Sequence, residues 1–192
     1  MPRFTVGLAS LPRRKSVQEV VLHSGTEPNG PAPPSALAAF NNQRFKMNDI
    51  HDLNRFIAAQ QGVYESVVQE LRSGTKRGHW MWYIFPQIAG LGRTATSQRY
   101  AIQSIDEAKA YYEHSVLGSR LRECTRLVID VCDRTAQQIF GHIDTLKFRS
   151  CMTLFDCVAK DEDTLFRDAL EKYFDGRADR LTLEILESGS DH

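Results

Sequence analysis

Residues 76–93 read Lys-Arg-Gly-His-Trp-Met-Trp-Tyr-Ile-Phe-Pro-Gln-Ile-Ala-Gly-Leu-Gly-Arg. This stretch holds both tryptophans of the chain, and cations stand at its two ends. Such a mixture suits a pocket for a planar or anionic ligand, because ring faces stack on planar groups and cations pair with anions. The stretch therefore indicates where a binding site lies, although it specifies no reaction.

If residues 79–87 form a helix, that helix is apolar on every side, which predicts a central buried helix ended by Pro86. Burial of His79 and of both indoles demands hydrogen-bond partners, which a neighbouring helix or a bound ligand can supply. A structural role and a binding role are therefore compatible for the same side chains.

The stretch ends in a glycine-containing loop, residues 89–94, in which Gly90 and Gly92 precede Arg93. Such a loop can present bare backbone N–H groups to a phosphate. Its spacing is neither that of a P-loop nor that of a dinucleotide-binding fingerprint, so an ordinary connection is the competing interpretation.

A second dense segment spans residues 140–153. Asp144 is placed to cap a helix, and Lys147 and Ser150 follow at one-turn spacing. We expect Lys147 and Ser150 to face the tryptophan-bearing helix and bind an anionic group; a cap with an exposed ion pair is the alternative. Cys151 would need a base and a lowered pKa to act as a nucleophile, and nothing nearby in the sequence supplies either.

These two segments supply the candidate site. Asp144 and His79 are weak candidates for a catalytic group, and the sequence leaves open whether turnover occurs. The residues that we expect to bind a ligand are Lys76, His79, Trp80, Trp82, Phe85, Gln87, Arg93, Lys147 and Ser150.

Composition limits the classes of protein that fit. A chain of 192 residues, 42% of them hydrophobic, is long enough for one ordinary core. Its 24 cationic and 24 acidic residues balance, so it lacks the overall positive charge of a general nucleic-acid binder. No apolar run is long enough to span a bilayer. The four cysteines match no zinc or redox spacing, so we expect reduced thiols and no metal site. We also expect no cofactor and a cytoplasmic location.

Helical periodicity dominates from Met47 onward. Apolar residues recur at steps of three and four from Leu53 to Leu71, and from Leu165 to Phe174. Ser104-x-x-Glu107 and Thr135-x-x-Gln138 have the spacing of capping boxes, and Asp175-Gly176 ends the last long run. We therefore predict an all-α fold, an irregular single-domain bundle of about six or seven helices.

Residues 1–46 differ from the rest because they hold six of the seven prolines. We predict a disordered extension there and a helical domain over residues 47–188. The arginines near the N-terminus, with no acidic residue among them, are also typical of a mitochondrial targeting segment. A start site misassigned upstream of Met47 is a further alternative.

Several of these motifs together resemble one family, the domain of unknown function 1810 family. The resemblance implies a mainly helical single domain and no established activity. It runs from about residue 50 to about residue 187 and rests on Lys76-Arg77-x-His79-Trp80-Met81-Trp82-Tyr83-Ile84-Phe85-Pro86-Gln87, Gly90-Leu91-Gly92, Leu117-Gly118-x-Arg120-Leu121, Ile139-Phe140-Gly141 and Asp144-x-x-Lys147-x-x-Ser150-x-Met152-Thr153-Leu154-Phe155.

Members of that family often carry the label "calpastatin". An inhibitor of the calpastatin kind is a long, disordered, charge-rich chain, whereas residues 47–187 are dense in apolar residues at helical period. We therefore reject that label.

A fainter likeness is to the NADAR family, which breaks an N-glycosidic bond to ADP-ribose. It rests on Phe56-x-x-x-Gln60, Asp144-x-x-Lys147, Met152 and a helix ending Lys172-Tyr173-Phe174; the NADAR acid has no match here, because Arg55 stands just before Phe56. The likeness implies Asp144 as a carboxylate at the reacting carbon, Trp80 or Trp82 as a stacking ring, and Lys76, Arg93 or Lys147 as a pyrophosphate-binding cation.

Two main classes of function fit these observations, and local nucleic-acid binding through Lys76 and Arg93 is a third alternative. The first is binding of a nucleotide-like or other small anionic ligand in an aromatic and cationic pocket, of which ADP-ribose chemistry is the most specific form. The second is a protein-interaction module in which the same aromatic side chains anchor a partner.

Overall fold

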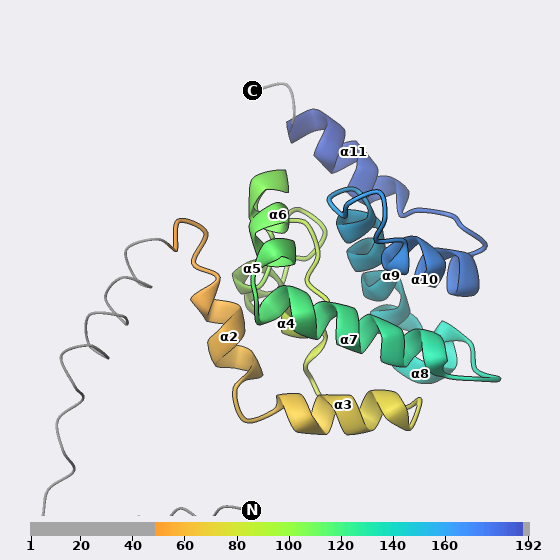
Figure 1. The fold of residues 1–192 in the computed structure, drawn as a ribbon. Helices are drawn as coiled ribbons and strands as arrows, with labels where there is room; N and C mark the ends of the chain where they lie inside the picture. The colour runs from red at the N-terminus through yellow and green to blue at the C-terminus, as the bar shows by residue number, and fades with distance from the viewer. Residues whose placement is uncertain (1–48, 190–192) are drawn as a thin grey trace, which may run out of the picture. The chain divides into compact units, whose positions relative to one another are not determined.

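The computed structural model describes residues 49–189, whose regular elements are helices (Figure 1). The predicted all-α class is confirmed, and six of the ten helices in that range have nine or more residues. The helices are α2 (Asn54–Gln60), α3 (Tyr64–Arg72), α4 (Met81–Ile84), α5 (Ala95–Arg99), α6 (Ile105–Glu113), α7 (Leu117–Asp130), α8 (Ala136–Phe140), α9 (His142–Asp156), α10 (Leu165–Phe174) and α11 (Arg180–Gly189).

Two further predictions concern residues 1–46 and the absence of a membrane-spanning segment. The predicted extension and targeting segment, residues 1–46, lie outside the described residues. Within residues 49–189, no helix combines the length and the apolar composition that a membrane crossing needs.

Local sequence signals place several helix ends correctly. The Ser104 hydroxyl accepts a hydrogen bond from the Glu107 backbone N–H at 3.1 Å and starts α6. Both halves of the capping box that starts α8 are present between Thr135 and Gln138. After α10 the backbone turns left-handed at Asp175, with φ of 53°, so the helix ends there as predicted.

The buried carboxylate of Glu107 departs from the expected capping box. It accepts from the backbone N–H of Gln103 at 2.9 Å instead of that of Ser104, and it forms an ion pair with Arg55. Arg55 also donates to the carbonyl groups of Arg99 and Ala101. This pair therefore ties α2 to the start of α6 and to the end of α5.

Two predicted helices differ from the observed ones. The apolar run from Leu53 to Leu71 is divided into α2 and α3, because Gly62 adopts a φ of 78° between them. The tryptophan-bearing helix is the single turn α4, which Trp80 precedes and Phe85 follows. Phe85 leaves the helical region because it stands before Pro86, whose ring disfavours helical backbone in the preceding residue.

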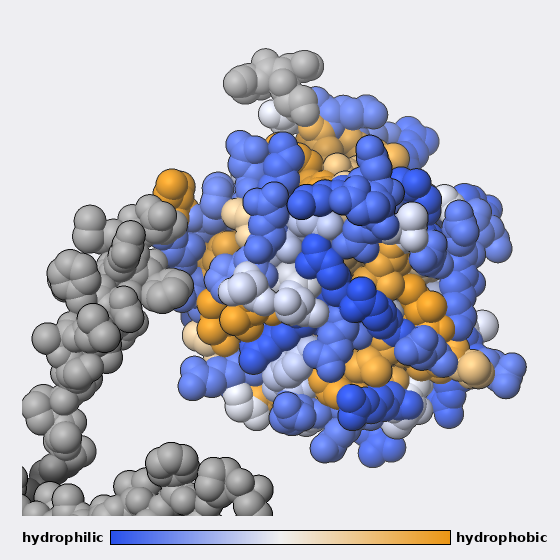
Figure 2. Space-filling model, in the orientation of Figure 1, coloured by the Kyte–Doolittle hydropathy of each residue, from blue (hydrophilic) through white to orange (hydrophobic). Residues whose placement is uncertain are grey.

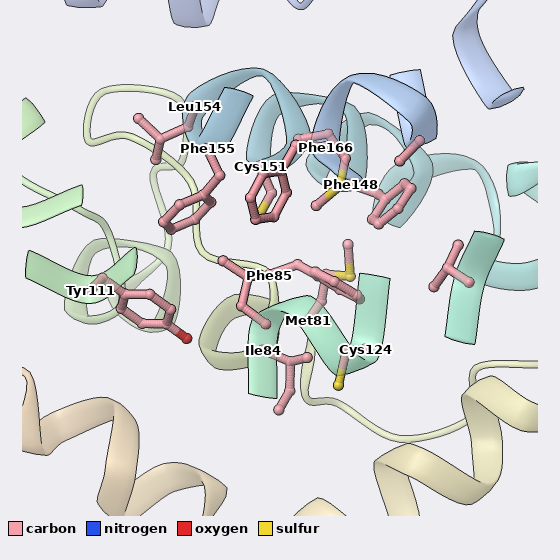
Figure 3. Packing of buried hydrophobic residues seen from close by; sticks show 14 of the residues in the cluster. Met81, Ile84, Phe85, Tyr111, Cys124, Phe148, Cys151, Leu154, Phe155 and Phe166 are labelled. Atoms are coloured by element: carbon pink, nitrogen blue, oxygen red, sulfur yellow. The ribbon is translucent and has the colours of Figure 1, made fainter. Parts of the chain in front are cut away.

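Helix α9 packs against both α4 and α10. Its residues Phe148, Cys151, Leu154 and Phe155 lie among the buried side chains drawn in Figure 3. Its fully buried Phe148 contacts Phe85 edge to face, with 5.0 Å between ring centroids, and stacks on Phe140 at 4.8 Å. Each such aromatic pair contributes about 0.5–1.5 kcal/mol beyond the area it buries.

Polar side chains cover most of the face drawn in Figure 2, with apolar patches between them.

We expect Gly118→Ala to destabilise the protein by about 1–3 kcal/mol in urea unfolding, because the added methyl group overpacks the site. A Cβ at this position would lie 2.0 Å from the backbone carbonyl oxygen of Tyr112. Helix propensity alone predicts the opposite sign, a gain of about 0.5–1 kcal/mol.

Gly189→Ala is the matched control, since no atom of the other described residues lies within 4 Å of a Cβ there. A Gly118→Ala protein as stable as the parent would show that α7 does not pack against α6 as described.

Candidate functional site

Three stretches that are far apart in the sequence line one cleft of about 510 Å³. The first stretch runs from the tryptophan-bearing turn α4 to α5, the second is the first part of α9, and the third is the chain at the start of α11. Their lining residues are Trp82, Gln87, Leu91, Gly92, Arg93, Thr94 and Ser97; Ile143, Leu146, Lys147 and Ser150; and Asp179 and Leu181.

Local structure explains why these stretches meet. On α9, Ile143, Leu146, Lys147 and Ser150 share one face because they are three or four residues apart. Helix α11 packs against α9 (Figure 1), and the Arg149 guanidinium donates to two carbonyl groups just before α11. The backbone bridge between Ile88 and Ile102 closes the loop that carries α5.

The structure brings together five of the nine predicted ligand-binding residues. Trp82, Gln87, Arg93, Lys147 and Ser150 all line the cleft. The Lys147 ammonium nitrogen lies 4.3 Å from the centroid of the half-buried Trp82 ring. The two segments singled out in the sequence therefore do face each other.

The remaining four predicted residues do not line the cleft. Phe85 and Trp80 belong to the hydrophobic core, with 0% and 2% of their surface exposed. His79 is exposed outside the cleft, and Lys76 faces Asp144.

The buried Trp80 indole donates its hydrogen bond to Glu70, so it needs no ligand as an acceptor. The Glu70 carboxylate accepts from the indole Nε1–H at 2.8 Å and from the backbone N–H groups of Arg77 and Gly78. Burial raises the pKa of Glu70, but these hydrogen bonds outweigh it and hold the pKa below its usual value.

Asp144 lies between two lysines. Its Oδ2 is 2.7 Å from the Lys76 ammonium group, and its Oδ1 is 2.7 Å from that of Lys147. The prediction that Asp144 caps the helix is wrong: α9 begins at His142, so Asp144 is already in its first turn. Burial raises the pKa of Asp144, but the two lysines dominate and lower it.

Ser150 lines the cleft, but its proton is committed elsewhere. The Thr182 hydroxyl donates to the Asp179 carboxylate at 2.7 Å, because a carboxylate can only accept. Thr182 must then accept in its 2.7 Å contact with the Ser150 hydroxyl, which makes Ser150 the donor. Ser150 therefore fixes α9 to α11 and has no proton left to donate to an anion.

Arg93 is exposed and makes no hydrogen bond or ion pair within the described part of the chain. The backbone N–H groups of residues 90–93 are likewise unbonded in the range 49–189. Glycine is required in this loop: Gly90 has a φ of 98°, and a Cβ on Gly92 would lie 2.5 Å from that of Ser97. Among the described residues, the loop thus has one cation and four donors without partners.

Cys151 does not have the environment of a nucleophile. It is fully buried, and burial raises the pKa of its thiol well above the usual value. Cys124 is also buried, whereas Cys132 and Cys157 are exposed, and all four thiols are free. Among residues 49–189, no cluster of three or more His, Cys, Asp or Glu side chains could hold a metal ion.

Little in the sequence indicates the third wall of the cleft, which Asp179 and Leu181 form. Asp179-x-x-Thr182 has the spacing of a helix cap, and Asp179 does accept from the Thr182 backbone N–H at 3.0 Å. Nothing in that spacing places the cap beside α9. The exposed apolar residues Ile143, Leu146 and Leu181 were missed because isolated exposed apolar residues are common.

Comparisons with known proteins give one family and one solved structure. The model of the family described as "Protein of unknown function (DUF1810)" matches residues 50–186. The conserved hypothetical protein Rv1873 from Mycobacterium tuberculosis, solved by crystallography, is 50% identical and superposes with a TM-score of 0.71. That match covers 72% of this chain and 99% of the mycobacterial chain. No curated protein matches the sequence.

We expect Asp144→Asn to lower the free energy of unfolding by about 1–3 kcal/mol, because an amide cannot replace the two charge-assisted hydrogen bonds. Since the folded pKa of Asp144 lies below its unfolded value, its contribution is present above about pH 4 and is lost as the pH falls through the folded pKa. The parent should therefore lose more stability between pH 5 and pH 2 than the variant, where both pH limits are approximate.

Asp106→Asn is the control for urea unfolding across this range. The Asp106 side chain is 76% exposed and lies 3.8 Å from Lys109, so its removal should change stability by less than about 0.5 kcal/mol. Equal losses for the two variants would contradict the role given to Asp144.

Proposed function

The chain belongs to the DUF1810 family of proteins of unknown function, and we propose that it binds a small anionic, nucleotide-like ligand in the cleft. The observation that carries the proposal is the meeting of Arg93, Lys147 and the Trp82 ring on one cavity. Those residues come from two segments more than fifty positions apart.

The charges of the cleft favour an anion. Arg93 and Lys147 are its cations and Asp179 its carboxylate. Lys147 is already paired with Asp144, so Arg93 is the cation most readily available to a ligand. A guanidinium group can bind a phosphate through two parallel hydrogen bonds.

The glycine loop and the cleft size support the same proposal. Unbonded N–H groups in a glycine loop are suitable donors for phosphate oxygens. The cleft volume of about 510 Å³ lies within the range of about 300–1,000 Å³ typical of small-molecule sites.

ADP-ribose is the most specific ligand that we propose, and the proposal is confined to binding. Cleavage of an N-glycosidic bond would require a carboxylate at the reacting carbon. Asp179 is the carboxylate that lines the cleft, whereas Asp144 is held between Lys76 and Lys147. Neither Asp144 nor His79 lines the cleft.

We expect titration calorimetry to detect binding of pyrophosphate and of ADP-ribose. Arg93→Ala should weaken both by at least about tenfold, because losing even one of its charge-assisted hydrogen bonds has that effect. Arg77→Ala is the matched control, because Arg77 is also exposed, its side chain makes no hydrogen bond or ion pair among residues 49–189, and it does not line the cleft.

Absence of binding by pyrophosphate, ADP-ribose and NAD at millimolar concentration would overturn the proposal. An equal loss of affinity in the two arginine variants would also overturn it, because the effect would then reflect net charge.

A second candidate is the binding of a protein partner, and the apolar rim of the cleft favours it. Ile143, Leu146 and Leu181 are 68%, 56% and 58% exposed, and they are three of the five large apolar side chains exposed among residues 49–189. Apolar groups that cluster beside cations suit a peptide with an apolar anchor flanked by acids.

For this candidate we expect the protein to enrich acidic peptides with an apolar anchor from a displayed library. Leu146→Asp should abolish the enrichment, because it places a charge on the apolar rim. Ile50→Asp should leave it intact, because Ile50 is 88% exposed but does not line the cleft. Unselective recovery of peptides, or enrichment that survives Leu146→Asp, would rule this candidate out.

A further inference from the structure

We propose that the ligand has two parts: its anionic part lies in the cleft, and a neutral planar ring that forms hydrogen bonds lies in an adjoining side pocket. The inference rests on the proposed function and narrows the ligand to a ribose phosphate carrying a heterocyclic base. It also assigns the base to a definite place.

The side pocket is a separate cavity of about 100 Å³. It shares four lining residues with the cleft, Trp82, Gln87, Gly92 and Ser97, so the two cavities adjoin. We therefore infer that one ligand with two parts occupies both cavities.

The two cavities differ in charge. Arg93, Lys147 and Asp179 line the cleft, whereas no charged side chain of the described residues lines the side pocket. A phosphate would lose its hydration in the side pocket without gaining a cation, which is costly. The neutral part of the ligand is thus the part that fits there.

The wall of the side pocket offers hydrogen bonds of both kinds. The side-chain amides of Gln87 and Gln98 make no hydrogen bond within residues 49–189. The Gln103 amide donates to the Ala101 carbonyl at 2.9 Å, which leaves its own carbonyl oxygen as an acceptor. Donors and acceptors in one small pocket match the edge of a heterocyclic base.

Ring faces and size further define the occupant. Trp82 and Tyr100 line the pocket, and Tyr100 is held in place by Phe56 and Tyr83, at 5.9 and 5.4 Å between ring centroids. Aromatic walls favour a stacked base. The small volume favours a single ring over a fused pair.

The test compares two ligands that differ only in the base, uridine 5′-monophosphate and ribose 5-phosphate, by titration calorimetry on the whole chain. We expect the uridine compound to bind at least about tenfold more tightly, as stacking of one base predicts. Adenosine 5′-monophosphate, with its fused rings, should bind less tightly than the uridine compound. ADP-ribose carries the same fused base, so it would bind through its phosphates in the cleft, with its adenine outside the side pocket.

Two variants locate the effect of the base. Gln98→Ala should reduce the ratio of the two affinities by about threefold or more while leaving ribose 5-phosphate binding unchanged, because it removes one hydrogen-bonding group. Ala89→Leu should bring the ratio close to one, because Ala89 lines the side pocket and not the cleft. Gln137→Ala is the matched control: Gln137 is also an exposed glutamine on a five-residue helix, and its side chain makes no hydrogen bond among residues 49–189.

Failure of this inference can be distinguished from failure of the proposed function. Equal affinities for the two ligands in the parent would overturn the base site and leave anion binding standing. An unchanged ratio in Ala89→Leu would place the base elsewhere, and tighter binding of the adenosine compound would overturn the single-ring assignment. No binding of either phosphate or of pyrophosphate would overturn the proposed function itself.

Discussion

The carboxylate of Asp144 determines the geometry of the candidate site. It binds the ammonium groups of Lys76 and Lys147, each at 2.7 Å, and so joins the chain before α4 to the first turn of α9. Lys147 is thereby held over the Trp82 ring, which fixes one wall of the cleft against the other. Without this carboxylate, the partly buried ammonium groups of Lys76 and Lys147 would repel each other.

The sequence allowed most of the helical architecture to be predicted, because local interactions determine where many helices begin and end. Thr135 and Gln138 satisfy each other's backbone groups, and the turn at Asp175-Gly176 needs left-handed backbone. The two site segments could also be found, since rings and cations at high density are rarely needed by an ordinary core helix. Trp82 and Lys147 do line one cleft.

The roles of individual side chains could not be predicted, because they depend on contacts distant in the sequence. Trp80 and Trp82 look equivalent in the sequence, but Glu70 binds the indole of Trp80 and leaves Trp82 to line the cleft. The sequence suggests Ser150 as a donor to an anion, but in the structure its proton is donated to Thr182. Periodicity also overestimated the length of α4, because Pro86 acts on the backbone of Phe85 before the helix can continue.

The most direct test of ligand binding in the cleft uses the two indoles of the chain as internal reporters. In ¹H–¹⁵N spectra of the labelled protein, titration with ADP-ribose should move the indole resonance of Trp82. The resonance of the buried Trp80, bonded to Glu70, should stay in place. Movement of Trp80 alone, or of neither indole at millimolar ADP-ribose, would contradict binding of this ligand in the cleft.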